Sequence, residues 1–146
     1  MLFTDDEWPG GKNLAISPAI WRRMFDAIPS PNFGLNYDPS HMELHYNTVG
    51  WTIEQLKDRI FHCHVKDTAG VPGKVMDDTF LFSLLGEGRV DWPGFFSAMN
   101  KIDYQGCLSV ECEAFRYYET TMKKDLRRCA ELFYHDYQSL NEQYGG

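Results

Sequence analysis

The stretch that decides the fold is Phe33-Gly34-Leu35-Asn36-Tyr37-Asp38-Pro39-Ser40-His41. Successive side chains of an extended chain point to opposite faces, so Phe33, Leu35 and Tyr37 share one apolar face. The other face ends in the carboxylate of Asp38. This alternation predicts a β-strand over Phe33 to Asp38 that finishes in a group able to bind a metal ion or to move a proton.

The same alternation recurs at two later segments. Residues 60–67 place His62 and His64 on one face, and residues 108–112 place Glu111 beside Ser109. The opposite, apolar faces hold Phe61, Cys63 and Val65 in one segment and Leu108, Val110 and Cys112 in the other. Helical segments separate the three strands, which predicts a parallel α/β sheet with its chemistry at the carboxyl ends of the strands.

Length and composition fit one folded domain. The chain has 146 residues, of which 43% are hydrophobic and 15% aromatic, enough for a real core. We therefore treat residues 1–146 as a single domain. The net charge of −7 offers no positive field for a phosphate backbone, so we expect no nucleic-acid partner.

The cysteines, the amino terminus and the apolar runs predict the cellular compartment of the protein. The four cysteines form no CxxC pair and are interpreted as reduced, structural residues. The amino terminus lacks a basic region and a long apolar core, and no run of about 18 uncharged apolar residues occurs. We expect a cytoplasmic protein with no membrane partner.

The first half of the chain alternates loops and helices. Residues 1–16 have no sustained period and are predicted to form a loop, and residues 17–142 form the α/β units. Ser17-Pro18 begins a helix with an apolar period that ends at Pro29. We predict a polar loop over Pro39 to Gly50 and a short helix over Thr52 to Asp58.

The second half contains a long insertion. Residues 68–88 are glycine-rich and long, which is typical of a functional loop over the strand ends. Asp91 can cap the next helix. A final amphipathic helix is predicted from about Tyr118 to Leu140. The two glycines of Gly86-Glu87-Gly88 are a weak nucleotide signal, and a turn before the capped helix is the simpler interpretation.

Asp38, His64 and Glu111 form a candidate metal-binding set. Carboxylate and imidazole ligands at neighbouring strand ends can meet at one divalent ion. The alternative for each residue is that it caps a helix or binds a loop amide. The shared position at three strand ends favours the metal.

Four further polar residues lie next to this set. His41 can contact a substrate hydroxyl or transfer a proton, or else be a solvated loop histidine. His62 is expected to pack beneath or support the ligands. Lys66 can meet an anionic substrate group and Asp67 can orient a ligand, or the two can form a surface ion pair.

Taken together, these motifs resemble the xylose isomerase-like TIM-barrel sugar phosphate isomerases and epimerases. The resemblance rests on Asn36 to His41, His62 to Asp67, Gly86 to Trp92 and Ser109 to Glu111, which occur in the family's order. It implies a partial (β/α) TIM barrel made of the last three parallel strands with their flanking helices.

The resemblance also implies a function and roles for residues. The family binds Mn, Mg, Co or Zn through Glu, Asp, His and Glu of its last four strands, and Asp38, His64 and Glu111 match the last three. Glu111 would act as an acid/base and His41 would contact substrate, while the first glutamate has no counterpart. The implied activity is isomerisation or epimerisation of a sugar, a sugar phosphate or a cyclitol by proton transfer beside a carbonyl.

Two other functions remain open. An endonuclease IV-like branch of the same fold cuts DNA at abasic sites, although the negative charge argues against it. The chain could also be an inactive truncated fragment or an interaction module. A complete barrel needs about 200 residues or more, and open strand edges favour self-association.

Overall fold

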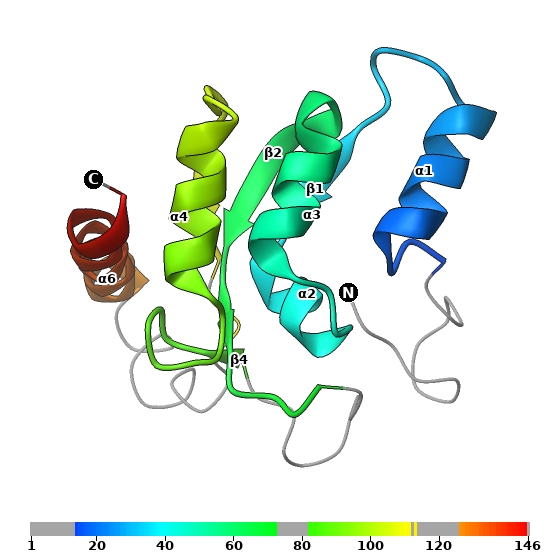
Figure 1. Cartoon of the computed structure of the whole chain (residues 1–146). Coiled ribbons are helices and arrows are strands. Elements are labelled where there is room, and N and C mark those ends of the chain that lie inside the picture. Colours follow the sequence, from blue (N-terminus) through cyan, green and yellow to red (C-terminus); the bar gives the residue numbers. More distant parts are fainter. Residues whose placement is uncertain (1–13, 73–81, 112, 114–125, 146) are drawn as a thin grey trace.

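A three-stranded parallel sheet organises the molecule (Figure 1). The computed structural model describes residues 14–72, 82–111, 113 and 126–145. The sheet is formed by β1 (Leu35–Tyr37), β2 (Ile60–Val65) and β5 (Leu108–Val110) in the order β1-β2-β5. The predicted strands, their direction and their order are confirmed, although β1 and β5 are shorter than expected.

The pairing of β1 with β2 contains an irregularity at Phe61. Leu35 pairs with Ile60, whereas the next residue, Asn36, pairs with His62. Phe61 is therefore skipped and is 48% exposed, so the prediction that it shares the buried face of Cys63 is wrong. Its ring lies against Gly34, where a Cβ would come within 2.6 Å of it.

Helices cover one face of the sheet. They are α1 (Pro18–Ala27), α3 (Val49–Leu56), which runs into the short 3-10 helix η1 (Lys57–Arg59), and α4 (Trp92–Lys101). In Figure 1, α3 and α4 stand side by side in front of the sheet. α6 (Leu126–Tyr144) packs on α4. The predicted final helix began at Tyr118, and residues 118–125 of it lie outside the described residues.

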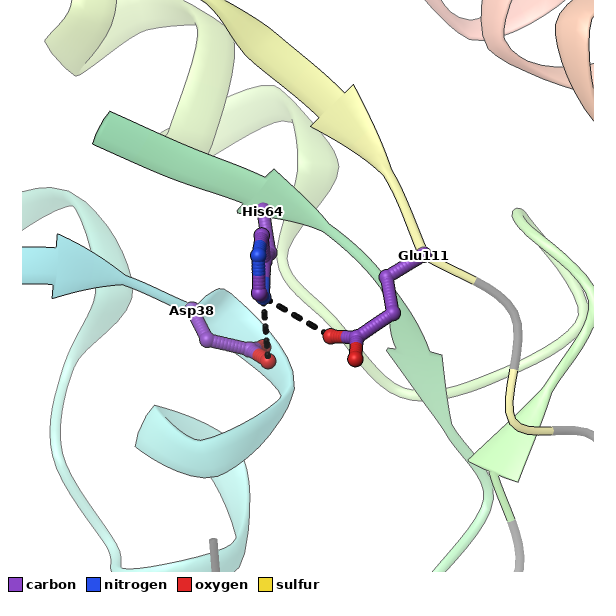
Figure 2. Close-up of side chains that lie close together, drawn as sticks. All are labelled: Asp38, His64 and Glu111. Atoms are coloured by element: carbon purple, nitrogen blue, oxygen red, sulfur yellow. Dashed lines mark ion pairs between the residues drawn. The ribbon is translucent and has the colours of Figure 1, made fainter.

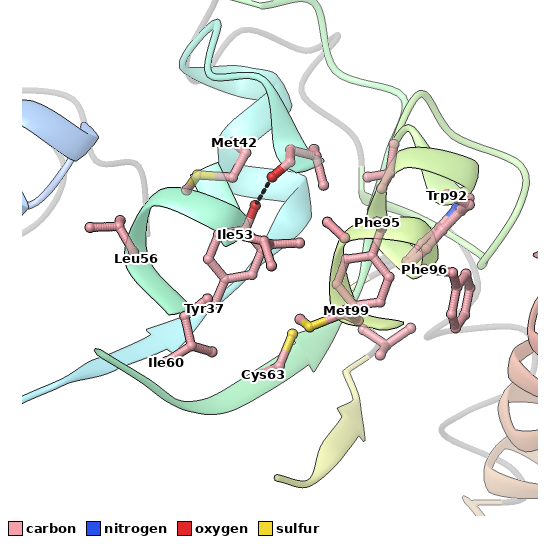
Figure 3. Close-up of a cluster of buried hydrophobic side chains, with 14 of the residues drawn as sticks. Tyr37, Met42, Ile53, Leu56, Ile60, Cys63, Trp92, Phe95, Phe96 and Met99 are labelled. Atoms are coloured by element: carbon pink, nitrogen blue, oxygen red, sulfur yellow. Dashed lines mark hydrogen bonds between the residues drawn. The ribbon is translucent and has the colours of Figure 1, made fainter. Parts of the chain in front are cut away.

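The hydrophobic core lies between the sheet and these helices (Figure 3). Tyr37 and Cys63 from the strands meet Ile53 of α3 and Phe95 of α4, all nearly inaccessible to solvent. The Tyr37 hydroxyl donates a hydrogen bond of 3.0 Å to the carbonyl of Val49. Burial fixes which face of each strand is covered and so sends Asn36, His62 and His64 to the other face.

The predicted loop over Pro39 to Gly50 is wrong, because it contains α2 (Pro39–Leu44) and the first two residues of α3. Asp38 caps α2, since its side chain accepts from the amide of Ser40, and Pro39 occupies the first turn. Both features favour a helix start. The polar composition of the segment concealed them.

The insertion after β2 begins with a small antiparallel pair. β3 (Asp67–Thr68) pairs with β4 (Phe82–Ser83), and residues 73–81 between them lie outside the described residues. The predicted turn and cap are confirmed: Gly86 has φ of 82°, and the Asp91 side chain accepts from the amide of Gly94 at 3.0 Å.

Two sequence expectations concern cysteines and membranes. Cys63 and Cys107 are free thiols, with Cys63 buried and Cys107 exposed. Among the described helices, none combines the length and apolar character needed to cross a bilayer.

Candidate metal centre

Three side chains meet at the carboxyl end of the sheet (Figure 2). Asp38 directly follows β1, His64 lies near the end of the central strand β2, and Glu111 directly follows β5. Parallel strands present their carboxyl ends at one edge, so residues at these positions converge. The helix-packed face is on the other side, which leaves the three groups free of the hydrophobic core.

The three groups are close enough to share one ion. One ligand atom from each lies within 4.8 Å of the others. Nδ1 of His64 is 2.7 Å from Oε2 of Glu111 and 3.9 Å from Oδ2 of Asp38. The predicted convergence of the three side chains is confirmed.

The oxygen atoms that face the centre have unused hydrogen-bonding capacity. Oδ2 of Asp38 and Oε2 of Glu111 are buried, and neither accepts a well-aligned hydrogen bond from the described residues. Buried polar atoms are nearly always hydrogen-bonded, so these two oxygens, which have ion-pair contacts but no aligned donor, fit a site for a further cation. Two carboxylates and an imidazole suit Mn, Zn or a similar divalent ion.

The two carboxylate oxygens of Asp38 have different contacts, one with the start of α2 and one with the candidate metal centre. Oδ1 accepts from the amide of Ser40 at 2.9 Å and from its hydroxyl at 2.6 Å, so the helix-cap alternative is also true of this residue. Burial raises the pKa of Asp38, but His64, His41 and Lys66 outweigh burial and hold it well below its usual range. The carboxylate is therefore anionic at neutral pH.

His64 carries contacts on both ring nitrogens. Nε2 lies 3.2 Å from the amide nitrogen of Asn36, and Nδ1 faces the two carboxylates. Asp38, together with Glu111, raises the pKa of His64 above its ordinary value. The ring of His62 stands perpendicular to that of His64, with centroids 5.6 Å apart, which is the neighbouring packing position expected for His62.

Lys66 is buried at the rim of the centre and does not pair with Asp67. Its ammonium lies 3.2 Å from Oδ2 of Asp38, 2.9 Å from Oε2 of Glu111 and 2.9 Å from Oε2 of Glu113. Burial disfavours the charged amine, but these carboxylates raise the pKa of Lys66 overall. The alternative of a surface ion pair is wrong, because both Lys66 and Asp67 are buried.

Asp67 binds the segment from Gly86 to Trp92. Its carboxylate accepts from the amides of Thr68, Gly86, Gly88 and Val90 and from the indole of Trp92, at 2.8 to 3.2 Å. None of these donors belongs to the candidate ligand set, so the expectation that Asp67 orients a ligand finds no contact among the described residues. Its observed role is to hold that segment against β3.

His41 lies at the edge of the centre. Its Nε2 is 3.4 Å from Oδ2 of Asp38, and its ring packs edge-on against Phe82. Burial lowers the pKa of His41 to about 4, so the imidazole is neutral at pH 7. The alternative of a solvated loop histidine is wrong.

Sequence reasoning missed two residues at the centre, Asn36 and Glu113. Asn36 shares the strand face that ends at Asp38, and Glu113 lies two residues beyond Glu111. Residues two apart in an extended chain share a face. The alternation that found the three candidate ligands could have found Asn36 as well, whereas Glu113 lies beyond the end of β5.

Comparison with known proteins decides the family. The family model for the xylose isomerase-like TIM barrel matches residues 4–132. The chain belongs to this family. The observed sheet is accordingly a part of the (β/α) barrel, its strands covered by helices on one face, as the resemblance implied.

Relatives of this family member are sugar enzymes by name. A candidate L-ribulose-5-phosphate 3-epimerase, SgbU, of Escherichia coli (strain K12) is 32% identical over 62% of this chain and 32% of its own length. An inosose isomerase of Bacillus velezensis is 29% identical over 73% of this chain and 38% of its own length. The chain thus spans about a third of the length of these curated relatives.

A solved structure shows the same fold. The crystal structure of the IOLI protein with a bound zinc atom superposes with a TM-score of 0.70 at 20% identity, covering 86% of this chain and 44% of that chain. At this identity, the likeness extends to the fold alone.

Proposed function

We propose that this chain carries the metal-binding and acid/base part of a sugar or cyclitol isomerase or epimerase. The observation that carries the proposal is the meeting of Asp38, His64 and Glu111 within 4.8 Å, with two buried oxygens that accept no well-aligned hydrogen bond from the described residues. The sugar-enzyme names of the relatives and the zinc named for the IOLI protein support it.

Asp38, His64 and Glu111 would hold a divalent ion such as Mn, Mg, Co or Zn. When bound, such an ion supplies a Lewis acid that stabilises negative charge on the carbonyl oxygen of a sugar. The residues of the chain supply the remaining functions of the site. Asp38 is kept anionic and fixed by its bonds to Ser40, so it binds and orients without moving.

Glu111 is the proton-transfer group in this proposal. Its side chain is 32% exposed, compared with 7% for Asp38, so it is the carboxylate more accessible to a substrate carbon. It takes a proton from the carbon beside the carbonyl and can return it to the same face. His41, which is neutral at pH 7, would hydrogen-bond a substrate hydroxyl, and Lys66 would help to bind an anionic group such as a phosphate.

Glu111 is the carboxylate that this proposal assigns to proton transfer among the described residues, and this assignment makes a distinctive prediction for the assay. One group can exchange the proton beside the carbonyl with solvent, but inversion needs a second group on the opposite face. We expect NMR to show Mn-dependent deuterium uptake from D2O into L-ribulose or an inosose, with little epimerisation. Glu111→Gln should abolish the uptake, whereas Glu131→Gln on the exposed surface of α6 should leave it unchanged.

Failure of this assay would separate the alternatives. Metal binding without exchange, in a folded protein, would favour an inactive fragment or an interaction module. Binding of abasic duplex at low salt would favour the endonuclease IV-like alternative, against which the net charge of −7 argues.

A further inference from the structure

Lys66 and the candidate ion depend on the same two oxygens. The ammonium lies 3.2 Å from Oδ2 of Asp38 and 2.9 Å from Oε2 of Glu111. These are also the buried oxygens without a well-aligned hydrogen bond among the described residues. Both carboxylates need a neighbouring positive charge, because burial of an uncompensated charge is costly. Lys66 provides a positive charge beside both oxygens, in addition to their contacts with Nδ1 of His64.

Glu113 differs from the other two carboxylates in its contact with Lys66. The ammonium donates a hydrogen bond of 2.9 Å to Oε2 of Glu113, whereas its contacts with Asp38 and Glu111 are ion pairs without hydrogen-bond alignment. Glu113 also lies outside the set of groups that can share an ion. It is therefore the partner that Lys66 can keep when the other two carboxylates turn to another cation.

Phe82 helps to fix this arrangement. The ammonium of Lys66 lies 4.3 Å from the centre of the Phe82 ring, and the side chain of Lys66 is only 4% exposed. An aromatic face attracts a cation, and burial leaves the lysine little room to leave the site. These contacts hold the charge of Lys66 at the rim of the centre.

We propose that Glu113 is a positioning residue that retains Lys66 while Asp38 and Glu111 serve a divalent ion. Lys66 and the ion then act as alternative positive charges beside the carboxylates of Asp38 and Glu111. Glu113 determines how strongly Lys66 competes with the ion for these two carboxylates. This inference rests on the metal centre of the proposed function.

A double-mutant cycle tests it, with Mn affinity measured by calorimetry at one fixed pH. Lys66→Gln should bind Mn about tenfold more tightly, because the competing charge is gone. Glu113→Gln should bind about tenfold more weakly, because Lys66 returns to Asp38 and Glu111. In the Lys66→Gln background, Glu113→Gln should change the affinity less than about threefold, since coupled residues give non-additive effects.

The cycle separates positioning from a simple field effect. Loss of one nearby negative charge would weaken Mn binding equally in both backgrounds, and that result would overturn the role of Glu113 while leaving the metal centre intact. No Mn binding by any of the four proteins would overturn both the inference and the metal centre. Glu131→Gln, which removes the same charge from an exposed site on α6, should not alter the affinity.

Folding is checked by circular dichroism. Lys66→Gln keeps a donor for the same oxygens, and Lys66→Met is the second variant if it does not fold. A Lys66 variant that folds only when Mn is added would support the exchange of counter-charges. If both variants remain unfolded at saturating Mn, the ion cannot replace the ammonium and the inference is wrong.

Discussion

Two histidines on one strand face have different environments. His64 faces Asp38 and Glu111, and His62 packs beside it without joining the set of groups that can share an ion. Only their position along β2 distinguishes them, because both belong to the same face of the strand. This difference provides a matched pair of substitutions.

We predict that His64→Ala weakens Mn binding at least about 100-fold, more than the 10- to 100-fold typical of residues that only support a ligand. His62→Ala should weaken it less than about tenfold. Isothermal titration calorimetry measures both. Equal losses in the two variants would contradict the assignment of His64 as the ligand.

His41 should make stability depend on pH. Burial lowers its pKa to about 4, whereas in the unfolded chain it titrates near 6.5. Between these values, the unfolded state binds more protons, so stability falls as the pH falls from about 6.5 to 4. The full difference corresponds to about 3 kcal/mol.

Urea unfolding of the metal-free protein in EDTA, from pH 7 to pH 4, measures this loss. Other groups titrate in the same range, so the comparison is with His41→Gln, whose stability should fall by about 3 kcal/mol less over the interval. Parallel pH profiles for the two proteins would show that burial of His41 does not govern the acid response.

At the scale of elements, the segment from Gly86 to Trp92 depends on one carboxylate. The Asp67 carboxylate accepts hydrogen bonds from three backbone amides and one indole of that segment. The segment leads directly into α4. Asp91 in the same segment has a different task, since it caps α4 from an exposed position.

Asp67→Asn should therefore cost about 3 kcal/mol or more of unfolding free energy, because an amide NH2 would face backbone donors and leave them buried and unsatisfied. Asp91→Asn should cost less than about 0.5 kcal/mol, since Asn caps helices as well as Asp. Denaturant unfolding of both variants decides the matter; similar costs would mean that the buried bonds of Asp67 contribute no more than a surface cap.

The predictable elements are those in which local pattern and tertiary packing agree. The strands ending at Asp38, His64 and Glu111 alternate cleanly, and their direction follows from the helices between them. The loop predicted at Pro39 to Gly50 failed because polar composition outweighed the capping signal of Asp38 and Pro39. The position of Phe61 was unpredictable from alternation, since the irregular pairing depends on the close approach of Gly34.

At the scale of the whole molecule, each outer strand has one neighbour. Among the described residues, β1 and β5 pair only with β2, and helices cover only one face of the sheet. The charge network around Lys66 also belongs to this scale, because it joins residues up to 47 positions apart. Sequence spacing within single motifs therefore could not predict the contact with Glu113.

Exposed strand edges promote association between chains. We predict that the purified chain forms oligomers whose mass rises with concentration, as measured by light scattering after size-exclusion chromatography. A monomer that persists at high concentration would contradict this prediction and would show that the two edges are protected.

The bond from the Trp92 indole to Asp67 gives the protein an internal optical reporter. Trp92 is 4% exposed and lies among the rings of Phe95 and Phe96, whereas Trp51 is 50% exposed. Emission from Trp92 therefore depends on whether the hydrogen bonds between Asp67 and the segment from Gly86 to Trp92 are intact. Trp51 is in contact with solvent in both cases. Fluorescence of a protein that keeps only Trp92, with Trp8, Trp21 and Trp51 each replaced by Phe, would thus follow local opening of this segment separately from loss of the whole fold.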